Sequence, residues 1–276
     1  CLVGSEMCIR DREYMIRGGM LDGVDCAVMI HPFSYDLVSH VWVGRRTLTA
    51  TFTGVPAHAS MQPYMGRNAL DAATLAYQAC GLLRQQMPPS DRLHAVLSDG
   101  GARASIIPES ATLQLYVRSL YTETLMDLSQ RVEDILQGAA LMTGTAVDAQ
   151  WDEHPMSLPV RNNATLARRW GATQASRGRD VLPAGTLPDS QAASTDFGNV
   201  SHLVPGIHPL VKIAPEGTAL HTTDFAAAAI SDQAFEGAFD AAVGLAQTIA
   251  DILNDPQLLA CLLYTSPSPR DKRQSR

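Results

Sequence analysis

The sequence lacks any apolar run of about 20 residues, the length needed to cross a bilayer. Glu6, Arg10, Asp11 and Arg12 interrupt the start of the chain, where a signal peptide needs an apolar core. Basic residues are also few, with 21 Lys and Arg against 28 Asp and Glu and a formal charge of −7. This acidic surplus repels a phosphate backbone. We therefore expect a soluble protein with neither nucleic acid nor a membrane as its partner.

Cysteine is scarce in the body of the chain. Three of the five cysteines, Cys1, Cys8 and Cys261, lie near the two ends. Residues 1–12 and 260–276 share no periodicity with their neighbours and resemble translated sequencing adapter, so we expect both segments to be foreign to the protein. The remaining residues, 13–259, carry a charge of −10, because the first segment is neutral and the last contributes +3. Cys26 and Cys80 provide no disulfide framework, which indicates a reducing cytoplasm.

The composition, 46% hydrophobic and 18% charged, is that of a globular protein with one large or two smaller domains. Residues 46–160 predict a compact α+β domain. Strict alternation over residues 47–53, with Leu48, Ala50 and Phe52 on one face, indicates a half-buried strand. Apolar spacings of three and four predict helices over 68–87 and 123–142, and further strands are expected at 93–97, 111–117 and 147–151. The resulting order β-α-β-β-α-β is ferredoxin-like.

The segments on either side of this domain have a different pattern. Residues 26–30 form an uninterrupted apolar run, which predicts a strand buried on both faces of a parallel sheet. Residues 204–213 predict another strand or a pair of strands. Helices are expected over 162–175 and over 231–253, the latter with Ala238, Ala242, Leu245, Ile249 and Ile252 on its buried face. We predict an α/β domain built from residues 13–45 and 161–259, interrupted by the domain at 46–160.

Several catalytic motifs are missing from the sequence. It contains no G-x-S-x-G elbow, no G-x-x-x-x-G-K-[ST] loop, no G-x-G-x-x-G turn and no C-x-x-C pair. Histidines stand at conspicuous places instead. His31 ends the apolar run, where open α/β sheets place their ligand sites, His58 follows an alternating strand, and His221 lies in a polar loop. By position alone, each is more simply a hydrogen-bonded structural residue.

Seven short motifs follow one another along residues 13–259. They are residues 23–32 (GVDCAVMIHP), 54–60 (GVPAHAS), 66–73 (GRNALDAA), the Gly-Gly and Ile-Ile-Pro of 100–108, 194–200 (STDFGNV), 205–209 (PGIHP) and 221–225 (HTTDF). In this order they resemble the M20 metallopeptidases, and within them the amidohydrolase branch that includes p-aminobenzoyl-glutamate hydrolase and the peptidase M20 domain-containing protein 2 dipeptidases. The resemblance implies a zinc-peptidase-like catalytic domain and an inserted ferredoxin-like lid that forms a homodimer. It also implies two Zn²⁺ ions per subunit, with Mn²⁺ as an alternative, and hydrolysis of a small amide or dipeptide.

The same resemblance suggests roles for five residues. His31 and His221 match metal ligands, and imidazole suits zinc. His58 matches a lid histidine that reaches the partner subunit's active site and stabilises the oxyanion, although a surface histidine is the simpler alternative. Arg118 matches an arginine that binds a substrate carboxylate, against the alternative of a solvated strand end. Asp196 matches a segment near the site, where a turn or cap role is equally compatible.

Other parts of the sequence depart from the family pattern. Ser105 stands where the family has an asparagine before Ile-Ile-Pro, and we expect His208 to be structural. The family's first metal ligands and its Glu-Glu pair precede the turn that corresponds to Gly18-Gly19, and no matching residues occur here. We therefore expect this catalytic domain to be incomplete and the 276-residue chain to be inactive. A non-catalytic M20 homologue that binds or regulates is the alternative, and a bare α+β binding module is a weaker one.

Overall fold

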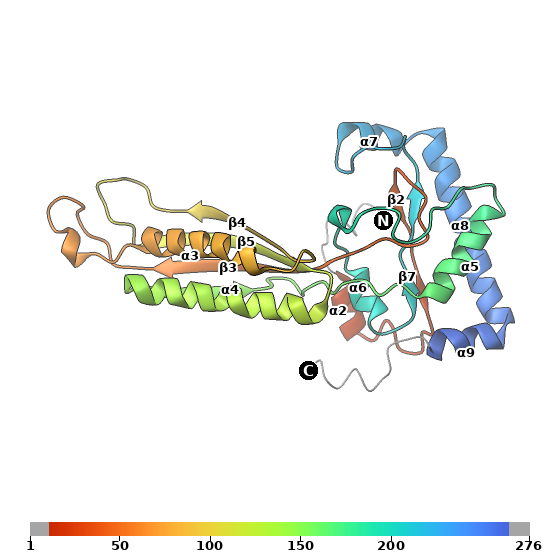
Figure 1. The fold of residues 1–276 in the computed structure, drawn as a ribbon, viewed down its shortest axis with the longest axis horizontal. Helices are drawn as coiled ribbons and strands as arrows, with labels where there is room; N and C mark the ends of the chain where they lie inside the picture. Colours follow the sequence, from red (N-terminus) through yellow and green to blue (C-terminus); the bar gives the residue numbers. More distant parts are fainter. Residues whose placement is uncertain (1–10, 265–276) are drawn as a thin grey trace. The chain divides into compact units, whose positions relative to one another are not determined.

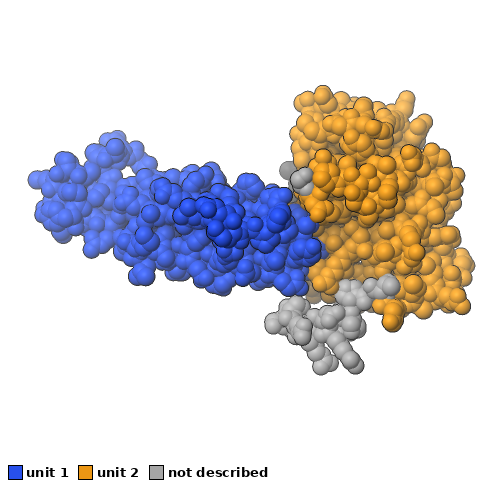
Figure 2. All heavy atoms as spheres, viewed as in Figure 1, with its two compact units in different colours: residues 1–10, 43–159 blue, residues 11–42, 160–276 orange. Residues whose placement is uncertain are grey.

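A computed structural model of the chain describes residues 11–264. The chain forms two compact units, shown in different colours in Figure 2. The inserted unit comprises residues 43–159, and the flanking unit comprises residues 11–42 together with the chain from residue 160 onward. These divisions fall at 42/43 and 159/160, against 45/46 and 160/161 in the sequence-based prediction.

The inserted unit is a four-stranded antiparallel sheet with two helices (Figure 1). Its elements follow the order β3 (Gly44–Thr53), α3 (Ala69–Leu83), β4 (Arg92–Asp99), β5 (Ser110–Ser119), α4 (Thr122–Thr143) and β6 (Ala146–Trp151). Short 3₁₀ turns occupy Pro63–Met65 and Arg84–Gln86. The strand order in space is β4-β5-β3-β6, which confirms the predicted ferredoxin-like arrangement.

The core of the inserted unit lies between the sheet and the two helices. Leu48, Ala50 and Phe52 of β3 are at most 2% exposed, as their alternation predicts. The buried side of α3 consists largely of alanines together with Cys80 and Leu83, while Tyr77 is 46% exposed. Alanine allows α3 to pack close against α4 and the sheet. Its positions in the core are hard to recognise from sequence, because alanine is less hydrophobic than the larger apolar residues.

The flanking unit contains two short parallel strand pairs surrounded by helices. β1 (Ala27–Val28) pairs with β7 (Gly206–Ile207), and β2 (His31–Phe33) pairs with β8 (Leu210–Lys212). The helices are α2 (Asp11–Arg17), α5 (Ala164–Ala175), α6 (Phe197–Ser201), α7 (Thr223–Ala228), α8 (Asp232–Asn254) and α9 (Pro256–Tyr264), with a 3₁₀ turn at Asp189–Gln191. The parallel pairing confirms an α/β arrangement.

Two predictions for the flanking unit were wrong. Residues 26–30 do not form one strand buried on both faces. The run is broken between β1 and β2, and its residues are half-buried. Within residues 11–264, each of these two strands pairs with a single neighbouring strand. The buried face of α8 is also rotated from the predicted one. It consists of Ala234, Gly237, Ala241, Gly244, Thr248 and Ile252, whereas Ala238, Ala242 and Ile249 are exposed.

Close packing of α8 explains this rotation. A Cβ atom added at Gly244 would lie 2.0 Å from Nε2 of Gln174 on α5, and one at Gly237 would lie 2.8 Å from the carbonyl oxygen of Lys212. The helix therefore packs through its smallest side chains. Its outer face consequently carries large apolar groups, with Phe235 75%, Phe239 56% and Leu253 79% exposed.

Parts of the segments expected to be foreign take part in this unit. Arg12 lies in α2, and residues 260–264 form the end of α9, where the Leu262 side chain is buried in the apolar cluster around Trp170. Residues 1–10 and 265–276 lie outside the described part of the chain. No helix within residues 11–264 is long and apolar enough to span a membrane.

Candidate functional site

The strand pair β2 and β8 brings two histidines together. His31 begins β2 and pairs in register with Leu210, the first residue of β8, and its N–H donates to the carbonyl of Pro209 at 3.0 Å. His208 therefore lies beside His31, with 5.8 Å between the ring centroids. The indole of Trp42 completes the group at 5.4 Å from the His31 ring and 4.5 Å from the His208 ring. We call these three residues the imidazole cluster.

His31 has the orientation expected of a metal ligand. Its Nδ1 lies 2.8 Å from the carbonyl oxygen of Pro32, and because a carbonyl can only accept, Nδ1 carries the proton. This tautomer leaves the lone pair on Nε2. Histidine ligands of metals commonly donate their other ring N–H to a carbonyl in this way.

His208 is buried, with 1% of its surface exposed. Its ring stacks on Trp42 with an interplanar angle of 7° and meets Phe197 edge-on at 5.4 Å. Burial, with smaller contributions from His31 and Arg12, holds the pKa of His208 well below its usual value, so the ring is neutral at pH 7. Neither ring nitrogen has a hydrogen-bond partner among the described residues.

Asp196 lies at the start of α6 and is 9% exposed. Although it occupies the N-cap position, its side chain makes no capping hydrogen bond and instead forms an ion pair with Arg12 of α2. A second contact joins the same two helices, where Asn199 donates to Glu13 at 2.7 Å. Asp196 thus binds a guanidinium in this structure.

His221 lies in the loop before α7 and is exposed. Its φ angle of 60° is in the left-handed region, which is uncommon for a residue with a side chain. The next residue, Thr222, caps α7 by accepting the N–H of Phe225 at 3.2 Å. Within residues 11–264, no three His, Cys, Asp or Glu side chains gather into a group that could hold a metal. The imidazoles of His31 and His208 fit a metal ion, but a complete ligand set is not formed here.

His58 is exposed in a loop of the inserted unit. Its Nδ1 accepts the backbone N–H groups of Ser60 at 3.3 Å and Met61 at 3.2 Å. Accepting at Nδ1 places the proton of the neutral ring on Nε2, which can then act as a hydrogen-bond donor.

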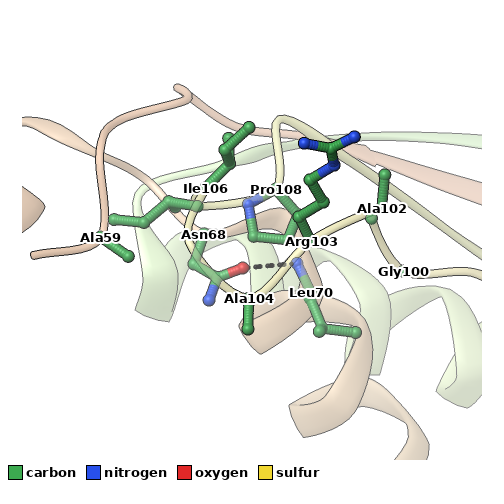
Figure 3. A pocket seen from close by; sticks show the side chains of 11 residues that line it. Ala59, Asn68, Leu70, Gly100, Ala102, Arg103, Ala104, Ile106 and Pro108 are labelled. Atoms are coloured by element: carbon green, nitrogen blue, oxygen red, sulfur yellow. Dashed lines mark hydrogen bonds between the residues drawn. The ribbon is translucent and has the colours of Figure 1, made fainter.

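A pocket of about 410 Å³ lies next to this loop, at the start of α3 (Figure 3). It is lined by Ala59, Asn68 and Leu70 and by residues 100–104 and 106–108. Asn68 caps α3 at the edge of this pocket, where its Oδ1 accepts the N–H of Leu70 at 2.9 Å. Arg103 is the charged residue of the lining.

Arg118 lies in a row of three arginines across the sheet. Arg45 of β3 and Arg92 of β4 are both its partners in register. The guanidinium carbons of Arg118 and Arg45 lie 5.3 and 5.4 Å from the centre of the Tyr116 ring. The buried Nε of Arg118 has no hydrogen-bond partner in the described part of the chain. The guanidinium of Arg92 donates to the backbone carbonyls of Pro89 and Asp91.

The sequence-based prediction did not place Trp42 and His208 beside His31. A signal for His208 was present, because His31-Pro32 and His208-Pro209 are both His-Pro dipeptides beside apolar strands. Parallel strands that follow one another in such a fold meet at one edge of the sheet, which would bring both histidines together. Trp42 had no comparable signal, since it lies in no motif.

Comparison with known proteins agrees with this architecture. The family described as the M20 peptidase dimerisation domain matches residues 43–142, which lie within the inserted unit. The chain is 34% identical over 245 residues to the Xaa-Arg dipeptidase of Mus musculus, covering 89% of this chain and 56% of that protein. It is 25% identical over 300 residues to one of the subunits of p-aminobenzoyl-glutamate hydrolase from Escherichia coli, covering 90% of this chain and 62% of that protein.

Solved structures share the fold. A dinuclear metal-binding peptidase of the M20 family from Bacillus subtilis has a TM-score of 0.57 and 16% identity, covering 84% of this chain and 60% of that one. The dimerisation domain and the sequence similarity to M20 relatives show that the chain belongs to the M20 peptidase family. Within that family it is similar to Xaa-Arg dipeptidase and to p-aminobenzoyl-glutamate hydrolase, and it spans little more than half the length of these curated relatives.

Proposed function

We propose that the protein containing this chain is a metal-dependent amidohydrolase that cleaves a small N-acyl amino acid or a dipeptide. The observation that carries the proposal is the orientation of His31, whose Nδ1–H is held by the Pro32 carbonyl at the start of the parallel strand β2. His31 and His221 would hold the metal, two Zn²⁺ ions per subunit or Mn²⁺ in their place. Such ions, when bound, polarise the scissile carbonyl and lower the pKa of a water molecule.

The other residues act on the substrate. His58 would donate from Nε2 to the developing oxyanion, a role supported by the two N–H groups that occupy its Nδ1. Arg118 would bind the substrate carboxylate, supported by its orphaned Nε and by the neighbouring Arg45. Asp196 would position the substrate or a cationic group near it, as its pairing with Arg12 illustrates.

The dimerisation domain supports a homodimer formed through the inserted unit. In the sheet order, β4 lies at an edge, where Val96 is 55% and Leu97 41% exposed. An edge strand with exposed apolar groups favours pairing with a second copy. The free thiols of Cys26 and Cys80 support a cytoplasmic location.

Turnover of a substrate panel tests the proposal. The panel contains dipeptides with a C-terminal arginine, β-alanyl dipeptides and aromatic acyl glutamates, each assayed with Zn²⁺ or Mn²⁺. Two proteins are compared, the 276-residue chain and a longer chain extended upstream in its gene. We expect metal-dependent turnover in the longer chain and little in the shorter one. In the longer chain, His58→Ala or His221→Ala should lower the turnover rate at least a hundredfold.

The matched control is His154→Ala, an exposed histidine in the loop after β6 of the inserted unit, which should keep full activity. Near wild-type rates in His58→Ala or His221→Ala would contradict the assigned roles. Absence of turnover across the panel in the longer chain would favour the second candidate, a non-catalytic M20 homologue.

A further inference from the structure

We propose that His208 is a metal ligand that shares one divalent transition-metal ion with His31. The inference rests on the proposed metal-dependent function and adds a residue to its site. It is based on the imidazole cluster, whose members all lie in the flanking unit.

The first argument is the cost of leaving His208 as it stands. Its ring is 1% exposed, and both ring nitrogens lack a partner in the described part of the chain. Buried polar groups in native proteins are almost always hydrogen-bonded, and an exception calls for a water molecule or an ion. A side chain needed only for packing against Trp42 would more simply be phenylalanine, which has the same flat shape without the nitrogens.

The second argument is geometric. Zinc–nitrogen bonds are about 2.0–2.1 Å long, so two imidazoles on one ion have ring centroids roughly 5–6 Å apart. The observed separation between His31 and His208 is 5.8 Å. The Pro32 carbonyl fixes the tautomer of His31, and the stack on Trp42 together with the edge of Phe197 fixes the plane of His208. Both rings are thus held in place before any ion arrives.

Zinc binding to the 276-residue protein tests the inference. Affinity is measured by competition with a chromophoric chelator, and the melting temperature is recorded with and without Zn²⁺. His31→Phe and His208→Phe should each weaken binding at least tenfold and remove most of the zinc-induced rise in melting temperature. Ring ¹⁵N NMR of the wild-type protein should show one His208 nitrogen shifting as zinc is added. His94→Phe, remote in sequence and in the other unit, should behave as wild type.

Melting temperatures measured without zinc show whether His208 is a metal ligand or a residue needed only for packing. Because phenylalanine preserves the stack and removes two orphaned nitrogens, His208→Phe should not lower the melting temperature without zinc. A lowered metal-free melting temperature with unchanged zinc affinity would show a structural role and overturn the inference. Loss of binding in His31→Phe but not in His208→Phe would overturn it while leaving the proposed function intact. Failure of wild-type protein to bind zinc would also overturn it, and the turnover assay would then judge the function separately.

Discussion

At the scale of single residues, the environment of a side chain decides its chemistry more than its type does. Cys26, Cys80 and Cys261 differ in exposure, and of these three only Cys80 is fully buried. It lies in the core of the inserted unit, and burial raises its pKa from 9.0 to about 11, with Arg84 opposing the shift. The thiol is therefore protonated at neutral pH and unreactive.

This raised pKa predicts a loss of stability in alkali. Below pH 9 the thiol is protonated in both the folded and the unfolded chain, and its contribution is complete. As the pH rises from 9 to 11, the unfolded thiol ionises first, so the free energy of unfolding should fall by about 2–3 kcal/mol. Urea unfolding at a series of pH values checks this.

The Cys80→Ala variant isolates the effect from other groups that titrate in the same range. Its free energy of unfolding should be lower at pH 7 because a buried sulfur is removed. Its decline between pH 9 and 11 should be shallower than that of the wild type, and parallel curves would contradict the assignment. Mass spectrometry should also find Cys80 unmodified after alkylation of the folded protein and modified after unfolding.

At the scale of elements, periodicity predicted where helices and strands lie better than which face they bury. The alternation in β3 and the six-element order of the inserted unit were confirmed, because alternate positions of a half-buried strand leave a clear pattern. The predicted face of α8 was wrong, because that helix packs through alanine and glycine. Two helix backbones approach closely only where the side chains between them are small. A search for large apolar residues does not find such positions.

The same limit applies to the candidate site. His31 was singled out because it follows the apolar run at 26–30, whereas the place of Trp42 became visible only in the fold, where its ring centroid lies 4.5 Å from that of His208. The arginine row around Arg118 likewise depends on strand register, which joins Arg45 and Arg92 across three strands. Contacts between residues far apart in sequence have no local signature.

Close packing of α8 predicts opposite outcomes for two glycines in helix interiors. Gly244→Ala should destabilise the protein by about 1–3 kcal/mol, because its Cβ would overlap Gln174 and lie 2.9 Å from Thr173 Oγ1. Gly138→Ala on α4 is the matched control. Nothing lies within 4 Å of its added Cβ, so it should stabilise the protein by up to about 1 kcal/mol through helix propensity.

Urea unfolding of the two variants and the wild type measures these changes. Equal effects of the two substitutions would show that propensity alone governs both positions. Such a result would contradict the close contact between α8 and α5.

At the scale of the whole molecule, each unit has an apolar core of its own. The core of the inserted unit is drawn entirely from residues 48–151, and the clusters around Trp170, Leu37 and Phe197 belong to the flanking unit. A domain with its own core can fold alone. Since the inserted unit is one continuous stretch of chain, it can be expressed separately as residues 43–159.

We predict that residues 43–159 alone unfold cooperatively in urea. Trp151 is the single tryptophan in that range, and its indole N–H donates to Glu133 at 2.9 Å, so its fluorescence reports on this core. The midpoint should match that of the corresponding transition in the 276-residue protein, where Trp42→Phe and Trp170→Phe leave Trp151 as the sole reporter. A gradual, non-cooperative change would show that the unit depends on the rest of the chain.

The exposed outer face of α8 affects how the protein must be handled at the bench. Phe235, Phe239 and Leu253 offer neighbouring molecules an apolar strip, and the net charge of −7 keeps those molecules apart. Added salt shortens the range of that repulsion to about 10 Å at 0.1 M while leaving apolar attraction in place. Concentrated samples should therefore remain clear at low ionic strength and become turbid as the salt concentration is raised. This is the reverse of ordinary salting-in. Protein stocks for crystallisation trials are therefore better kept in buffer of low ionic strength.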